Sequence, residues 1–326
     1  MAPAQRFEAV EQLETQLRSA GLDLRLSQLS NGRLDGSLLF SRLGPLRLLR
    51  LQANRRLHVA GGKPRDQRMV ALSLLPHGSA LPLRAHGTRI GAEVLFGLDP
   101  RGEVHLSTPE RMDLALLLLE PTSLTPWSDG PGGLDLEMAP FRANLLPIAT
   151  HHRVALRGHL LNALSFREGQ FIVGAGPPPP LPGRPEGALM PLLAEALGHG
   201  LELQGAPTRP PARIALVKQL QDWVMDHPEE PISLETLCQQ VHVGRRCLIQ
   251  GFQEHLGLGP MAYFKLQRLH GVRRALLAAG PDTVTISGLA ASWGFLNPGH
   301  FARDYSRLFG ELPSATRAAV GSPGSG

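Results

Sequence analysis

The sequence predicts an α+β chain, with a strand-rich N-terminal part followed by an all-helical C-terminal part. From about residue 22 to residue 119, short apolar runs alternate with turn residues such as Gly61-Gly62-Lys63-Pro64, a texture typical of many short strands. Beyond residue 209, apolar residues recur at helical spacing. A chain of 326 residues is long enough for two domains, so we expect one domain of each kind.

Local patterns predict the N-terminal elements in order. Apolar residues on one face predict a helix near 5–19. Strands are expected at 46–51, 56–60, 69–75, 90–98 and 103–106, and helices at 151–166 and 187–203. Prolines at 174–185 separate these last two helices, and a second Pro-rich break at 205–212 is the expected domain boundary. We therefore expect an N-terminal domain at 1–205, a linker at 206–212, a helical domain at 213–320 and a flexible tail at 321–326.

Composition limits the possible environment. The formal net charge of +5 fits a nucleic-acid partner without requiring one. Two cysteines, Cys238 and Cys247, are too few for a disulfide framework or a four-cysteine zinc site, which fits a reducing cytoplasm. The apolar run Leu114–Leu119 is too short to span a bilayer, and the first residues show no signal-peptide pattern. The sequence therefore predicts a cytoplasmic protein with no membrane partner.

One pattern in the C-terminal part occurs twice. At an offset of 52 residues the matched pairs are Ser233/Thr285, Leu234/Ile286, Leu237/Leu289, Cys238/Ala290, Val241/Trp293 and Val243/Phe295. At an offset of 53 they are Leu248/Phe301, Phe252/Tyr305, Leu256/Phe309, Gly257/Gly310 and Pro260/Pro313. Each copy has a short apolar helix, a tight turn and a second helix, which is the anatomy of a helix-turn-helix unit. Two units in series suggest a protein that contacts two successive turns of DNA.

In the first unit, Ser233 is the expected N-cap of a helix with a buried face at Leu234, Leu237, Cys238 and Val241. The turn is at 242–244. The second helix buries Leu248, Phe252 and Leu256 and exposes Arg245, Arg246, Ile249, Gln250 and Gln253. Arg and Gln at the exposed start of a recognition helix are the side chains that reach guanine and adenine edges.

In the second unit, Thr285 is the expected cap, and Asn297-Pro298 is typical of an N-cap followed by proline at the first helical position. The helix after it buries Phe301, Tyr305 and Phe309 and exposes His300, Arg303 and Arg307. Arg303 falls at the position equivalent to Gln250. From both units the candidate DNA-binding residues are Arg245, Arg246, Gln250, Asn297, His300, Arg303 and Arg307.

A long helix near 260–279 is expected to join the two units. Twenty residues span roughly 30 Å, close to one DNA turn of roughly 34 Å. Lys265 and Arg268 on this helix are candidates for phosphate contacts. For Arg273 and Arg274, an internal salt bridge is as good an interpretation as a phosphate contact.

Residues 232–317 resemble the AraC/XylS family of bacterial transcriptional regulators. The resemblance rests on Ile-Ser-Leu-Glu-Thr-Leu at 232–237, and above all on Trp293-Gly294-Phe295, His300-Phe301-Ala302-Arg303-Asp304-Tyr305 and Leu308-Phe309-Gly310-Glu311-Leu312-Pro313-Ser314. It implies promoter DNA as partner, RNA polymerase as a further one, and activation rather than repression. It also implies an upstream domain, cupin-like in fold, that binds a small-molecule effector or forms a homodimer.

Two other interpretations remain open. One is a metal-dependent, cupin-like enzyme domain fused to the DNA-binding module, because His58, His77, His86 and His105 are scattered over the strand-rich part. No tight His-x-His pair occurs among them, and no cysteine precedes Cys238, so we expect no enzyme, no catalytic residue, no cofactor and no metal. His151-His152 is interpreted as a solvated helix start. The other interpretation is a regulator whose upstream domain binds no ligand and only dimerises.

Overall fold

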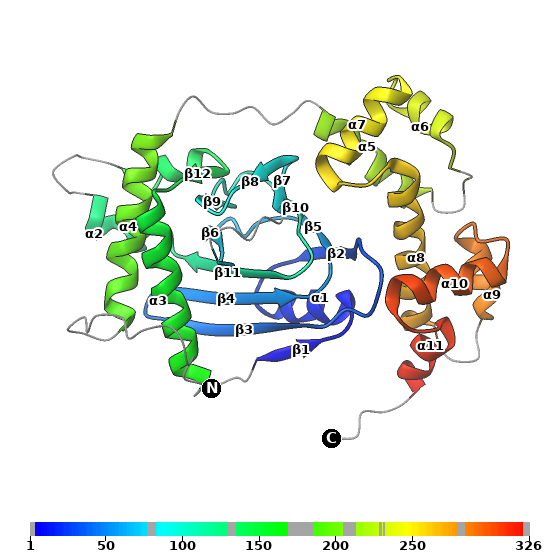
Figure 1. Ribbon diagram of the computed structural model, residues 1–326, viewed down its shortest axis with the longest axis horizontal. Helices are drawn as coiled ribbons and strands as arrows, with labels where there is room; N and C mark the ends of the chain where they lie inside the picture. The colour runs from blue at the N-terminus through cyan, green and yellow to red at the C-terminus, as the bar shows by residue number, and fades with distance from the viewer. Residues whose placement is uncertain are drawn as a thin grey trace.

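The structure is a computed structural model, and it describes residues 4–76, 83–128, 135–168, 185–204, 213–227, 230, 232–279 and 284–321. The proline-rich segment at 174–184, the expected linker 206–212 and residues 322–326 of the expected tail lie outside the described residues. A strand-rich part and a helical part lie side by side (Figure 1). The predicted α+β class, with sheets first and helices after, is confirmed.

The N-terminal part is built mainly of strands. Its elements are β1 (Gln5–Phe7), α1 (Val10–Ser19), β2 (Leu24–Gln28), β3 (Gly36–Leu43), β4 (Leu46–Ala53), β5 (Leu57–Gly61), β6 (Arg68–Ser73), β7 (Leu83–Ala85), β8 (Thr88–Ile90), β9 (Val94–Phe96), β10 (Val104–Ser107), β11 (Met112–Leu119), η1 (Pro121–Leu124), α2 (Thr125–Ser128), η2 (Ala139–Arg142), β12 (Leu145–Pro147), α3 (Thr150–Glu168) and α4 (Pro185–Leu203). One sheet has seven strands in the order β1-β3-β4-β11-β6-β9-β12, and the other has five in the order β2-β5-β10-β7-β8.

The seven-stranded sheet is buried on both faces. In β6, Val70 packs into a core with α3 and α4, whereas its neighbour Ala71 packs into the core shared with the five-stranded sheet. In β11, Leu117 and Leu118 divide between the same two cores. Successive side chains of a strand point to opposite faces, so a strand covered on both sides needs an unbroken apolar run. This explains the run at 114–119, and it gives three layers: helices, sheet and sheet (Figure 1).

Two N-terminal predictions were wrong in their boundaries. The helix expected from residue 5 begins at Val10, because Gln5–Phe7 pairs with β3 as a strand. The strand expected at 90–98 is divided into β8 and β9. β8 pairs with β7 in one sheet, whereas β9 pairs with β6 and β12 in the other. The chain crosses between sheets at 91–93, a change of partner that local periodicity does not reveal.

The C-terminal part is helical. Its elements are α5 (Arg213–Asp226), α6 (Leu234–Gln240), α7 (Arg245–Leu256), α8 (Pro260–Ala278), α9 (Ile286–Ser292), α10 (Pro298–Phe309) and α11 (Pro313–Gly321). α5, α6, α7 and the start of α8 share one core, and the rest of α8 shares a second core with α9 and α10. Leu266 on α8 packs against both cores. The two repeats are therefore two small helical units joined by α8.

Candidate nucleic-acid interface

In each unit a short helix, α6 or α9, precedes the second helix, α7 or α10, and its N-cap fixes where the unit begins. Ser233 Oγ accepts a hydrogen bond from Thr236 N at 3.0 Å, and Thr285 Oγ1 accepts one from Gly288 N at 3.0 Å. Both predicted N-caps are therefore confirmed. Such a cap fixes where a helix starts, because it satisfies one of the four amides that lack an intrahelical partner.

The first unit presents its predicted side chains on α7. Arg245 and Arg246 begin the helix and are exposed, and so is Gln250 one turn later. Gln250 Nε2 donates to Glu254 Oε1 at 2.8 Å, and Arg213 Nη1 binds the same carboxylate at 3.0 Å. The Gln250 side chain thus lies along the helix surface, with its amide oxygen available as an acceptor.

The second unit presents its predicted side chains on α10. Asn297 Oδ1 accepts from His300 N at 3.0 Å, and Pro298 opens the helix, which confirms the predicted cap. His300, Arg303 and Arg307 are exposed. The Asn297 oxygen is engaged in the cap, and its amide N–H groups are the donors it can offer another partner. Arg303 and Gln250 each stand one turn into an exposed helix, in matched positions of the two units.

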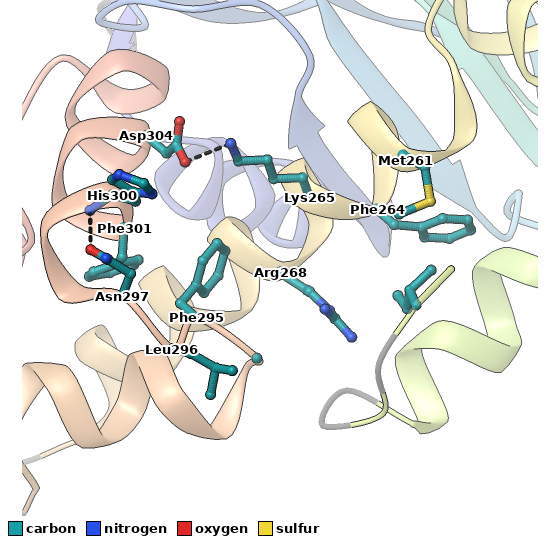
Figure 2. A pocket seen from close by; sticks show the side chains of 12 residues that line it. Met261, Phe264, Lys265, Arg268, Phe295, Leu296, Asn297, His300, Phe301 and Asp304 are labelled. Atoms are coloured by element: carbon teal, nitrogen blue, oxygen red, sulfur yellow. Dashed lines mark hydrogen bonds and ion pairs between the residues drawn. The ribbon is translucent and has the colours of Figure 1, made fainter. Parts of the chain in front are cut away.

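A hollow of about 250 Å³ separates the start of α10 from α8 (Figure 2). Lys265 Nζ on α8 pairs with Asp304 Oδ2 on α10 at 2.6 Å across it. Leu296, in the turn before α10, is 90% exposed at its edge. Arg268 donates to the carbonyl oxygen of Glu230. The two cations that the sequence offered for phosphate contact therefore already have protein partners, and Asp304 was not among the predicted site residues.

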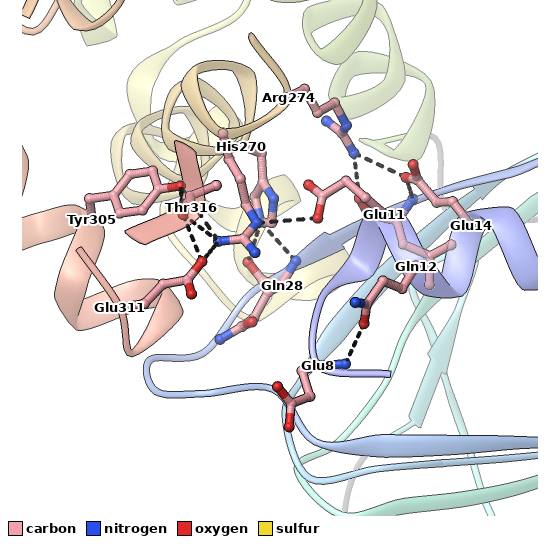
Figure 3. A network of polar contacts seen from close by, with 12 residues as sticks. Glu8, Glu11, Gln12, Glu14, Gln28, His270, Arg274, Tyr305, Glu311 and Thr316 are labelled. Atoms are coloured by element: carbon pink, nitrogen blue, oxygen red, sulfur yellow. Dashed lines mark hydrogen bonds and ion pairs between the residues drawn. The ribbon is translucent and has the colours of Figure 1, made fainter. Parts of the chain in front are cut away.

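Arg273 and Arg274 bind other parts of the protein. Arg273 pairs with Glu11 at 3.2 Å and with Glu311, and its side chain is 9% exposed. Arg274 pairs with Glu14 Oε1 at 3.0 Å. Of the two interpretations left open, the internal salt bridge is the right one. It joins α8 to α1 of the N-terminal part and not only to the second unit (Figure 3).

Three histidines of the N-terminal part, His58, His105 and His152, are buried. His58 Nε2 and His105 Nε2 are 3.3 Å apart, and His105 Nε2 lies 3.2 Å from Gln221 Oε1 of α5. His152 is 3% exposed, so its interpretation as a solvated residue was wrong, whereas His151 is exposed as expected. Among the described residues, no group of three or more His, Cys, Asp or Glu side chains is placed to hold a metal ion. His77 lies outside the described residues.

The α8 helix sets the scale of the interface. It has 19 residues and so spans about 28 Å, slightly less than one turn of DNA at roughly 34 Å. α7 and α10 lie at different heights along it (Figure 1). None of the helices in the described part of the chain combines the length and the apolar character needed to cross a membrane.

Comparison with known proteins agrees with this geometry. A family model described as a helix-turn-helix domain matches residues 237–319. The probable thc operon regulatory protein of Rhodococcus erythropolis is 36% identical over 104 residues, which are 32% of this chain and 31% of that protein. The XylDLEGF operon transcriptional activator 2 of Pseudomonas putida is 33% identical over 99 residues, which are 30% of this chain and 63% of that protein.

A solved structure shows the same extent of similarity. The crystal structure of a probable AraC family transcriptional regulator from Rhodopseudomonas palustris is 33% identical and covers 32% of this chain and 97% of that chain, with a TM-score of 0.30. The chain thus spans less than two thirds of the length of each of the two curated relatives, 31% of one and 63% of the other. Every one of these matches covers about a third of this chain. Residues 237–319 are therefore a helix-turn-helix domain, and the C-terminal third of the chain is similar to operon regulators of the AraC/XylS type.

Proposed function

We propose that the protein is a sequence-specific, DNA-binding transcriptional regulator that responds to a small effector. The observation that carries the proposal is the pair of exposed recognition helices, α7 and α10, joined by a helix of about one DNA turn. Arg246, Gln250, His300 and Arg303 would meet base edges, with Arg245, Asn297 and Arg307 beside them. Arginine binds guanine and glutamine binds adenine in the major groove.

Several finer statements belong to the same proposal. Activation is favoured because the Pseudomonas putida relatives are named activators. We further propose a cytoplasmic homodimer that contacts RNA polymerase. These three properties are proposed by applying the family resemblance to the whole chain. An enzymatic role is not proposed, because the curated relatives are named as regulatory proteins.

Replacing Arg303 with alanine is expected to weaken DNA binding by about 1–3 kcal/mol and to relax the preference at the base pair it meets, as for a bidentate arginine–guanine contact. The measurement is footprinting and salt titration of the full chain on its own upstream DNA, where the parent should protect two adjacent grooves. The exposed Arg25 of β2, changed to alanine, is the matched control and should bind like the parent. Unaltered affinity and sequence preference for the Arg303 variant would show that the recognition surface is misassigned.

A cavity between the two sheets is the candidate effector site. It has a volume of about 90 Å³, and apolar side chains such as Leu26, Leu49 and Leu114 line most of it. Lys63 is a polar group at its wall, with Nζ 2.7 Å from Asp99 O and 2.7 Å from Asn144 Oδ1. Burial lowers the pKa of Lys63 to about 8. An apolar cavity with one ammonium group suits a small apolar molecule that carries one acceptor or acidic group.

Two residues of the cavity lining contact the helical part. Glu103 lines the cavity and pairs with Lys218 of α5 at 2.7 Å. His105 also lines the cavity and contacts Gln221 of α5 at 3.2 Å. A ligand that moves Glu103 or His105 changes contacts made directly by α5. The cavity and the DNA-binding part are therefore coupled through two neighbouring side-chain pairs.

Pentanoate is expected to raise the melting temperature of the parent more than pentanol does, because only the acid pairs with Lys63. At a ligand concentration ten times the Kd, binding would stabilise the folded protein by about 1.4 kcal/mol. This corresponds to a rise in melting temperature of a few degrees for a protein of this size. Lys63→Met should remove the difference between the two compounds, and Ala71→Leu, which fills the cavity, should remove both shifts. If pentanoate raises the melting temperature equally in the parent and in Ala71→Leu, the ligand binds outside this cavity.

A further inference from the structure

The C-terminal end of the first recognition helix is capped by the N-terminal domain. α7 ends at Gly257, which has the left-handed φ of 67° that favours glycine. The last four carbonyls of a helix lack intrahelical partners. One of these, Leu256 O, accepts a hydrogen bond from Arg56 Nη2 at 2.7 Å. A Cβ atom at Gly257 would lie 2.9 Å from the same Arg56 nitrogen and 3.4 Å from Arg84 Nη1. Two cations thus gather at the negative end of the α7 dipole.

The second recognition helix is capped by the same domain. α10 ends at Gly310, with a φ of 74°. Gly32 N donates to Arg307 O at 2.9 Å and to Leu308 O at 3.0 Å. Gln28 Nε2 donates to Leu308 O at 2.7 Å. The backbone of Arg33 lies so close that a Cβ at Gly310 would be 2.8 Å from its nitrogen. The matched glycines of the two repeats therefore stand at equivalent contacts with the N-terminal domain.

The groups that donate hydrogen bonds to both helix ends belong to one small piece of the N-terminal domain, residues 28–33 and 54–57, which we call the corner. Leu29 N donates to Arg56 O at 2.8 Å, and Arg56 N donates to Ser30 Oγ at 3.0 Å. Arg55 Nε donates to Arg33 O at 3.2 Å. The same segment also reaches α8, because Gln28 N donates to His270 Nε2 at 2.8 Å (Figure 3). The corner is thus internally hydrogen bonded and in contact with α7, α8 and α10.

Within the C-terminal part itself, α8 and a few contacts across it join the two units. Each unit has its own core, and Leu266 is the side chain that packs against both. Long helices curve, and a bend in α8 would rotate one recognition helix against the other. The corner contacts the C-terminal ends of both α7 and α10. These contacts, together with α8, prevent one recognition helix from rotating relative to the other.

We propose that the corner fixes the orientation of α7 relative to α10 and thereby sets the spacing of the two DNA half-sites that the protein accepts, with Arg56 and Gln28 as its positioning residues. The proposal rests on the proposed DNA-binding function. Neither residue need touch DNA, because both act on the C-terminal ends of α7 and α10, whereas Arg246, Gln250, His300 and Arg303 lie in the first half of these helices. Half-site spacing follows from the geometry of the two recognition helices.

The test uses the full chain and the DNA fragment that it protects, with one or two base pairs inserted between the two protected grooves. The parent should bind the unaltered spacing best. The spacing preference is the affinity for the unaltered fragment divided by the affinity for the altered fragment. Arg56→Met should lower this ratio by roughly tenfold, because a factor of ten corresponds to the free energy of about one hydrogen bond from a charged group. Arg56→Lys keeps a cation at the carbonyl and should restore most of the ratio. Arg25→Met, on the exposed face of β2, should leave it unchanged.

A folded Arg56→Met protein with the full spacing preference of the parent overturns the proposal. Hydrogen exchange of the parent gives a second reading that needs neither DNA nor a variant. The Gly32 amide should be protected to the same degree as the last turn of α10, and exchange at the rate of a free loop amide also overturns the proposal. A parent that gives no two-groove footprint rejects the proposed function itself, and Gly32 exchange then still reports whether the corner contact exists.

Discussion

Replacing Arg273 with methionine is expected to lower the free energy of unfolding by about 3 kcal/mol or more. Breaking a buried ion pair by removing one partner typically costs about 3–5 kcal/mol, because the remaining charge is left without compensation. Glu311 is 36% exposed and Glu11 is 18% exposed. Water can therefore solvate part of the charge left behind, which places the expected cost at the lower end of the range.

The contacts of Arg273 explain why its replacement is expected to cost so much stability. It bonds to Glu11 of α1 and to Glu311 after α10, and its guanidinium carbon lies 4.8 Å from the centre of the Phe309 ring. Burial alone would lower its pKa, but Glu11, Tyr305 and Glu311 together outweigh burial and raise it. One side chain therefore ties the second helix-turn-helix unit to the N-terminal domain while remaining charged.

Urea denaturation of the full chain measures this effect. Arg25→Met is the exposed control and should shift the midpoint little, as expected for a surface position. The double variant Arg273→Met/Glu11→Gln should be less destabilised than the sum of its single variants, because no unpaired carboxylate then remains at Glu11. A loss below about 1 kcal/mol for Arg273→Met, the range of a surface ion pair, would mean that the pair is solvated in solution.

The helical part could be predicted well from the sequence because its signals are local. Ser233, Thr285 and Asn297 each cap a helix through an amide three residues later, and that spacing is visible in the chain. The AraC/XylS resemblance is confirmed for the same region. Cys238 was expected to be buried and is only partly so, because the repeat pattern shows a helix face and not the depth of packing on it.

The contacts between the two parts could not be predicted in the same way. Gln28 meets Leu308 across 280 residues, and Arg56 meets Leu256 across 200. No periodicity joins positions so distant, and a lone Arg or Gln in a strand-rich region is usually a surface residue. The same limit hid the pairing of His58 with His105, whose side chains meet because β5 and β10 are neighbours in the smaller sheet. The recognition residues stay predictions, since exposure alone does not test what they bind.

Buried histidines give the second large expected effect, a loss of stability in mild acid. His58, His105 and His270 are at most 5% exposed. Burial is the main cause that lowers their pKa values, with Lys218 adding to it at His58, His58 at His105, and Arg274 at His270. The pKa of His58 falls to about 4, that of His105 to about 2 and that of His270 to about 3. All three are therefore neutral in the folded protein near neutral pH.

The direction of the effect follows from proton binding. An unfolded histidine has a pKa of about 6.5, so between that pH and about 4 the unfolded chain binds protons that the folded chain does not. The stability that neutral burial provides is fully present above pH 6.5 and is lost as the pH falls below it. Each histidine contributes about 1.4 kcal/mol per pH unit inside this window, and three together contribute about 4 kcal/mol per pH unit.

Urea denaturation midpoints between pH 8 and pH 5 test this expectation. The free energy of unfolding should be nearly constant above pH 7 and should fall steeply below pH 6.5. His105→Gln should reduce the slope by about one proton, whereas His242→Asn, at an exposed left-handed position with a φ of 52°, should leave it unchanged. A stability that stays flat down to pH 5.5 would contradict neutral burial. Two of these histidines lie at contacts between the helical part and the sheets, since His105 contacts Gln221 and His270 contacts Gln28, so protonating them also weakens those contacts.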